Sequence, residues 1–175
     1  MHSDNEFVQK FIDACASANA MGWRKFHMEV FNSLERSNPN LYELLHGIIS
    51  QANLFKRDEY IIRETVALII KVIWPIPPIS AATTSRVSGI LQSRDRSHQV
   101  DFVADGLKCW QEGVWQPLYL EIDKFLQDVS VGNNTLYHST RAVVCMFMAT
   151  INYELSDNSD NSIESQLASI PGIKI

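Results

Sequence analysis

Apolar residues recur along this chain at the spacing of an α-helix. Near the start, Phe7, Phe11, Ala14 and Ala18 follow one another at intervals of four, three and four residues, which places them on one helix face. The same spacing returns in later segments, between polar or proline-containing breaks. The pattern predicts an all-α protein of about eight helices, which begin near residues 4, 22, 39, 58, 81, 98, 117 and 135.

Prolines and capping residues mark where these helices begin and end. Pro39 and Pro117 suit the start of a helix, because proline there loses only an amide that has no intrahelical partner. The run Trp74-Pro75-Ile76-Pro77-Pro78 ends a helix, since its prolines remove amides and favour extended backbone before them. Side-chain caps are predicted at Ser3, Asp58 and Thr135.

The segment Glu59–Trp74 is apolar on nearly every side, which is typical of a helix buried at the centre of a protein. Its many isoleucines and valines leave a β-strand as the alternative. Strands seldom exceed about 10 residues, and this segment is longer. We therefore predict a buried central helix.

The predicted helices start at intervals of roughly 18 residues, which suggests antiparallel pairs in a compact bundle. A short α-solenoid of helix pairs, of the HEAT kind, is the alternative, although no repeated residue signature supports it. We expect one helical domain over residues 1–155. Residues 156–175 should form a polar linker and tail, because they begin with the run Ser-Asp-Asn-Ser-Asp-Asn-Ser.

Composition narrows the possible classes of protein. Hydrophobic residues make up 46% of the chain, enough for a packed core. Glycine and proline number only 7 and 6 among 175 residues, which fits long helices. Without a glycine-rich run, neither a P-loop nor a dinucleotide-binding fingerprint can form. No cofactor is predicted.

The chain carries no targeting signal of a recognised kind. Its first residues include acids where a secretory signal needs bases and then an apolar run. The apolar segment Ile61–Trp74 is too short to span a bilayer and contains charged residues. Cys15, Cys109 and Cys145 are far apart and form no Cys-x-x-Cys pair. These features predict a cytoplasmic protein without membrane association.

Charge is distributed unevenly around a formal total of −5. Residues 57–100 contain four acids and six bases, whereas residues 101–130 contain six acids and two bases. This balance argues against a nucleic-acid partner and favours a cationic protein partner for the second of these segments. Trp and Tyr dominate protein contact sites, and both occur among the acids. We therefore predict a partner-binding surface made of Asp101, Asp105, Glu112, Trp115, Tyr119, Glu121, Asp123 and Asp128. In the alternative interpretation, Trp115 plugs the end of the bundle and the acids only confer solubility.

Three weaker constellations remain. Arg86, Arg94 and Arg96 form a weak candidate anion site, although Asp95 could serve as their counter-ion. An imidazole and two carboxylates share one helix face at His98, Asp101 and Asp105, as an enzyme or ligand-binding site would require. A Glu-x-x-His pair at residues 43 and 46 has no second copy, so no metal site is predicted. Serine and cysteine lack any recognised catalytic motif.

These observations predict a small acidic protein that binds another protein and blocks or recruits it, rather than an enzyme. Bacterial immunity proteins and antitoxins that neutralise basic nuclease toxins have a similar profile, being small, cytosolic, acidic and free of catalytic motifs. One alternative is a helical enzyme or ligand-binding bundle that uses His98, Asp101 and Asp105. Another is a HEAT-like adaptor that binds peptides along a concave face.

Overall fold

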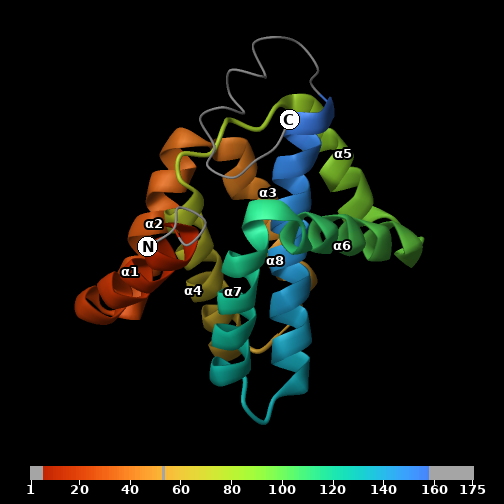
Figure 1. Ribbon diagram of the computed structural model, residues 1–175. Coiled ribbons are helices and arrows are strands. Elements are labelled where there is room, and N and C mark those ends of the chain that lie inside the picture. The colour runs from red at the N-terminus through yellow and green to blue at the C-terminus, as the bar shows by residue number, and fades with distance from the viewer. Residues whose placement is uncertain (1–5, 53, 158–175) are drawn as a thin grey trace.

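The computed structural model describes residues 6–52 and 54–157, and these residues fold into helices without any strand (Figure 1). The α-helices are α1 (Glu6–Met21), α2 (Trp23–Ser37), α3 (Pro39–Gln51), α4 (Lys56–Ile73), α5 (Ala81–Gln92), α6 (Arg96–Gln111), α7 (Gln116–Val129) and α8 (Asn134–Asp157), with a short 3-10 turn, η2 (Gly113–Trp115). From α2 onward, each α-helix begins within two residues of its predicted start. The all-α prediction is confirmed, and α4 is a helix rather than the alternative strand.

Two of the predicted caps are wrong, and the third, Ser3, lies outside the described residues. Helix α4 begins at Lys56, so Asp58 lies within its first turn instead of before it. Helix α8 begins at Asn134, and the side chain of Asn133 accepts the amide of Leu136 at 3.0 Å. Caps form at Ser80 and Asp95 as well, where the side-chain oxygens accept amides of the first turns of α5 and α6. Each cap therefore lies at a short polar residue immediately before the apolar stripe.

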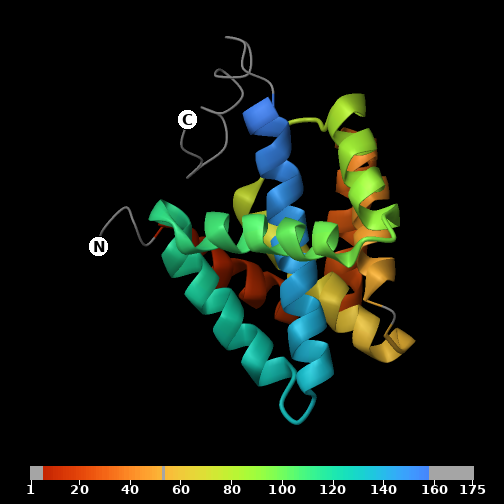
Figure 2. The ribbon, with the colours of Figure 1, turned by 90° about the vertical axis from the view of Figure 1, so that its right-hand side faces the viewer.

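Helix α8 runs through the middle of the protein, and α6 lies across it (Figures 1 and 2). Helix α8 packs against α3, α4, α5, α6 and α7, while α4 packs against α1 and α2 on its other side. Elements far apart in the sequence, such as α1 and α7, also touch. In a solenoid, each repeat contacts only its neighbours. The structure is therefore the predicted compact bundle, and the solenoid alternative is wrong.

The backbones of α6 and α8 touch where the two helices cross. A Cβ atom built on Gly106 would lie 1.7 Å from the carbonyl oxygen of Cys145, so only glycine allows this approach. One turn further along α6, the buried indole of Trp110 donates a hydrogen bond of 3.2 Å to the carbonyl oxygen of Val144. These two contacts fix the position of α6 on α8 and leave its outer flanks facing away from the core.

The proline-containing segment between α4 and α5 is held by the side chain of Asn38, which is 1% exposed. Its Nδ2 donates to the Pro77 carbonyl at 2.9 Å, and its Oδ1 accepts the Ile79 amide at 3.0 Å. Asn40 adds one hydrogen bond of 2.8 Å, from its Nδ2 to the Ile79 carbonyl. Because prolines cannot supply amides to a helix or sheet, these asparagines satisfy backbone groups that would otherwise be buried without partners.

A buried histidine should make the stability of the bundle depend on pH. The ring of His27 in α2 is 5% exposed and lies near the rings of Phe31 and Tyr60. Burial lowers the pKa of His27, and the nearby Arg63 and Arg24 lower it further. Burial also lowers the pKa of His46, with Arg63 contributing again. The buried His27 and the partly buried His46 therefore both favour their neutral forms in the folded protein.

We expect the free energy of unfolding to fall as the pH is lowered through about 6.5, the ordinary pKa of histidine in an unfolded chain. Below that pH the two imidazoles are protonated in the unfolded chain but remain neutral in the folded protein, so acid favours unfolding. Urea unfolding at several pH values measures this dependence. His27→Phe should reduce it, with His46 accounting for part of the remainder. A variant with the same pH dependence as the wild type would contradict this assignment.

None of the described helices is both long enough and apolar enough to cross a membrane.

Candidate functional site

The outward side of α6 and its C-terminal end carry three exposed carboxylates. Asp101 and Asp105 lie one turn apart on one flank of α6, and Glu112 is the first residue after the helix, which ends at Gln111. We call these three residues the acidic flank. Lys108 is exposed among them, while the opposite side of α6 is buried against the core. The helix and Glu112 therefore present three negative charges and one positive charge to solvent.

The remaining predicted acids, on α7, are placed differently. Asp123 is partly buried and accepts hydrogen bonds from the Tyr137 hydroxyl and from the Gln127 side chain, the latter at 2.8 Å. Glu121 is also partly buried and lies 3.8 Å from the ammonium of Lys124. Only Asp128 among the three is fully exposed. The hydrogen bond from Tyr137 joins α7 to α8, so Asp123 has a structural role. The same hydrogen bond raises the pKa of Tyr137 to about 12.

The two aromatic residues predicted for the surface belong to the core. Trp115 is 5% exposed and packs against the rings of Phe7 and Trp110, with ring centroids 5.1 and 5.8 Å away. Tyr119 is 8% exposed, stacks on Trp110, and its hydroxyl accepts a 2.9 Å hydrogen bond from Arg141. Both rings support the end of α6 from inside. Neither ring is exposed enough to form part of a contact surface.

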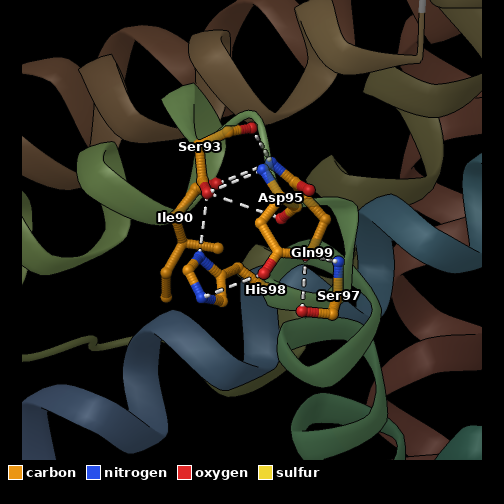
Figure 3. Close-up of polar contacts among 6 residues, drawn as sticks. All are labelled: Ile90, Ser93, Asp95, Ser97, His98 and Gln99. Carbon is orange, nitrogen blue, oxygen red and sulfur yellow. Dashed lines mark hydrogen bonds and ion pairs between the residues drawn. The ribbon is translucent and has the colours of Figure 1, made fainter.

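A serine, a histidine and an aspartate meet at the turn between α5 and α6 (Figure 3). The hydroxyl of Ser93 lies 2.8 Å from Nδ1 of His98, whose Nε2 lies 3.9 Å from a carboxylate oxygen of Asp95. No catalytic motif in the sequence indicates this grouping; the only signal is the local spacing Ser-x-Asp-x-x-His. The same atoms also close the turn, because Ser93 accepts the Asp95 amide at 3.1 Å and Asp95 caps α6 through Ser97. The hydrogen bonds of Ser93 and Asp95 to the backbone therefore give this group a structural role in closing the turn and capping α6.

The predicted set of His98, Asp101 and Asp105 is not brought together as one site. His98 turns toward Ser93 and Asp95, as described above. The carboxylate of Asp105 instead accepts the hydroxyl of Tyr153 on α8. Across the described ranges, no three His, Cys, Asp or Glu side chains come close enough to hold a metal ion. His98 and Asp105 therefore contact different partners and do not form one constellation.

The three cysteines are free thiols. Burial raises the pKa of Cys15, of Cys109 and of Cys145, the last to about 11. A thiol with a raised pKa holds its proton at neutral pH and is a poor nucleophile. These side chains therefore behave as small packing groups.

The structure divides the predicted arginine cluster into two parts. The guanidinium of Arg86 on α5 lies 3.7 Å from the centre of the Tyr153 ring. Arg94 and Arg96 are exposed and line an open cavity of about 490 Å³ between α3, α5, α6 and α8. Arg86 is not among the residues of this cavity.

No family model, curated protein or solved structure matches this chain.

Proposed function

We propose that this protein binds a cationic surface of another protein through the acidic flank of α6, and that it blocks or recruits that partner. The observation that carries the proposal is the combination of three exposed carboxylates, two on one flank of α6 and one directly after it, with a fixed core side. Gly106 and Trp110 hold the helix against α8, so the spacing of the carboxylates is set before a partner arrives. A surface ordered in advance loses less entropy when it binds.

Two of the three carboxylates of the acidic flank are available to a partner, since the third, Asp105, already accepts the Tyr153 hydroxyl. Asp101 and Glu112 are exposed and accept no side-chain hydrogen bond from the described residues. A lysine or arginine of the partner can therefore bind either of them without displacing an existing contact. Charge-assisted pairs of this kind are stronger than neutral hydrogen bonds, and exposed charges of one sign accelerate encounter with the opposite sign.

The proposed partner is a basic protein of the cytoplasm, such as a nuclease toxin, which would make this protein an immunity protein or antitoxin. Nucleases carry basic surfaces because they bind a polyanion, and an acidic protein can compete for such a surface. The net charge of −5 and the free thiols are consistent with this role and with a reducing cytoplasm.

Affinity capture with three baits tests the proposal. The first bait is the wild type, and the second is Asp101→Lys/Glu112→Lys. The third, Glu29→Lys/Glu35→Lys, makes the same charge change at two exposed acids of α2. We expect at least one protein from the native lysate to be retained by the wild type and by the α2 variant, and to be lost from the α6 variant. Helicity measured by circular dichroism should be the same for all three.

Equal loss of the partner from both variants would contradict the proposal, because the charge change would then act regardless of its position. A captured protein that the α6 variant binds as well as the wild type does would contradict it too. Raising the salt concentration should weaken the specific capture, since exposed charge pairs are screened.

A further inference from the structure

A second feature of α6 lies away from the acidic flank. The nine residues from Arg96 to Asp105 correspond to about two and a half turns, so these two side chains point to opposite sides of the helix. The side that carries Arg96 borders the cavity of about 490 Å³. This cavity is therefore separate from the surface proposed to bind a protein.

The cavity combines a cationic rim with apolar walls. Arg94 and Arg96 supply two guanidinium groups, and Gln51 and Ser93 add polar side chains. Leu91, Val100 and Met146 supply the apolar part of the lining. Val100 is 64% exposed, so an apolar side chain at the edge of the cavity is open to a ligand.

The acid between the two arginines does not neutralise them. One carboxylate oxygen of Asp95 accepts both the amide and the hydroxyl of Ser97, at 2.9 and 2.7 Å (Figure 3). The other oxygen faces His98 at 3.9 Å. Among the described residues, no carboxylate forms an ion pair with Arg94 or Arg96, whereas Arg63 pairs with Glu59 at 3.0 Å. The idea that Asp95 is the counter-ion of its neighbours therefore does not describe the folded protein.

We propose that this cavity binds a small phosphate monoester whose organic part is apolar. Two guanidinium groups without a carboxylate partner match the charge of a phosphate monoester, which is between about −1.5 and −2 at neutral pH. Arginine forks also suit the geometry of phosphate oxygens. The exposed side chain of Val100, beside the nearly buried Leu91 and Met146, gives the organic part an apolar surface to lie against, which inorganic phosphate alone would not contact.

Isothermal titration calorimetry with defined probes tests this proposal. The probes are phenyl phosphate, inorganic phosphate and benzoate, each at about 0.15 M ionic strength so that unspecific charge effects are screened. We expect phenyl phosphate to bind about tenfold more tightly than either other probe, because only phenyl phosphate combines an apolar ring with the dianion. In Arg94→Gln/Arg96→Gln, phenyl phosphate should bind about tenfold more weakly or not at all.

Lys56→Gln/Arg57→Gln is the matched control, because it removes two exposed bases from the first turn of α4 that do not line the cavity. This variant should bind phenyl phosphate as the wild type does. Equal losses in both variants would overturn the site. If benzoate bound as tightly as phenyl phosphate, the assignment of the site to phosphate would be overturned. If inorganic phosphate bound as tightly, the assignment of an apolar organic part to the ligand would be overturned. A protein that binds none of the probes overturns the proposal altogether. The α6 charge-reversal variant of the capture experiment should bind phenyl phosphate normally, so the two proposals can fail separately.

Discussion

Replacing Gly106 with alanine is expected to lower the free energy of unfolding by about 3 kcal/mol or more, at the upper end of what overpacking costs. The added methyl group would lie 1.7 Å from the carbonyl oxygen of Cys145 and 2.5 Å from its carbonyl carbon. Both atoms belong to the backbone of α8, so no side chain can rotate away and the two helices must separate. Urea unfolding measures the loss, and the melting temperature should drop by about 6–12 °C.

Gly89→Ala provides the matched control. Gly89 also lies inside a helix, α5, but a Cβ atom there would meet no other atom within 4 Å. Alanine should therefore raise the free energy of unfolding by about 0.5–1 kcal/mol, the ordinary preference of a helix for alanine over glycine. Similar effects of the two substitutions would show that α6 and α8 do not touch as described.

Replacing Asn38 with alanine is expected to lower the free energy of unfolding by about 3 kcal/mol. The substitution leaves the Pro77 carbonyl and the Ile79 amide without the hydrogen bonds of 2.9 and 3.0 Å that Asn38 provides. Each buried backbone group that loses its partner costs about 1–3 kcal/mol, so two together give an effect of this size. Thermal and urea unfolding of the purified variant measure it.

Asn40→Ala serves as the comparison, because Asn40 makes a single, partly buried hydrogen bond to the Ile79 carbonyl. We expect a loss of about 1 kcal/mol. An Asn38 variant no less stable than the Asn40 variant would contradict the role of Asn38 in holding the segment between α4 and α5.

Periodicity predicted the helices well because each one has a single dominant apolar face. The buried residues of α1, for example, are the four that the spacing indicates, Phe7, Phe11, Ala14 and Ala18. Helix α4 was predicted correctly because its length outweighs its β-branched content. Caps were harder to predict, since several short polar residues compete at each helix start. At α8, Asn133 provides the cap in place of Thr135, two residues later.

Contacts between distant elements could not be derived from local patterns. Nothing near Gly106 in the sequence indicates that α8 passes directly against it. Trp115 and Tyr119 lie among acids, which suggested a surface, yet both pack on Trp110. A large aromatic ring between polar neighbours is compatible with either location, and only the position of α1, α6 and α8 decides between them.

The candidate site was predictable only where its residues lie on one helix. Spacing along one helix was sufficient to align Asp101 and Asp105 on α6. It was not sufficient to show that Asp123 is tied to Tyr137 across two helices, or that Arg86 lies against Tyr153 while Arg94 and Arg96 share a cavity. Those distinctions depend on how helices pack, which the sequence encodes only through the whole core.

The central claim is that the acidic flank of α6 binds a cationic protein. Its most direct test is the dissociation constant of the captured partner, measured by calorimetry against the wild type, Asp101→Lys/Glu112→Lys and Glu29→Lys/Glu35→Lys. We predict that the dissociation constant of the α6 variant is at least about tenfold larger than that of the wild type, a modest loss for two attractive charge pairs that become repulsive. The dissociation constant of the α2 variant should be close to that of the wild type. Equal constants for the two variants would contradict the claim.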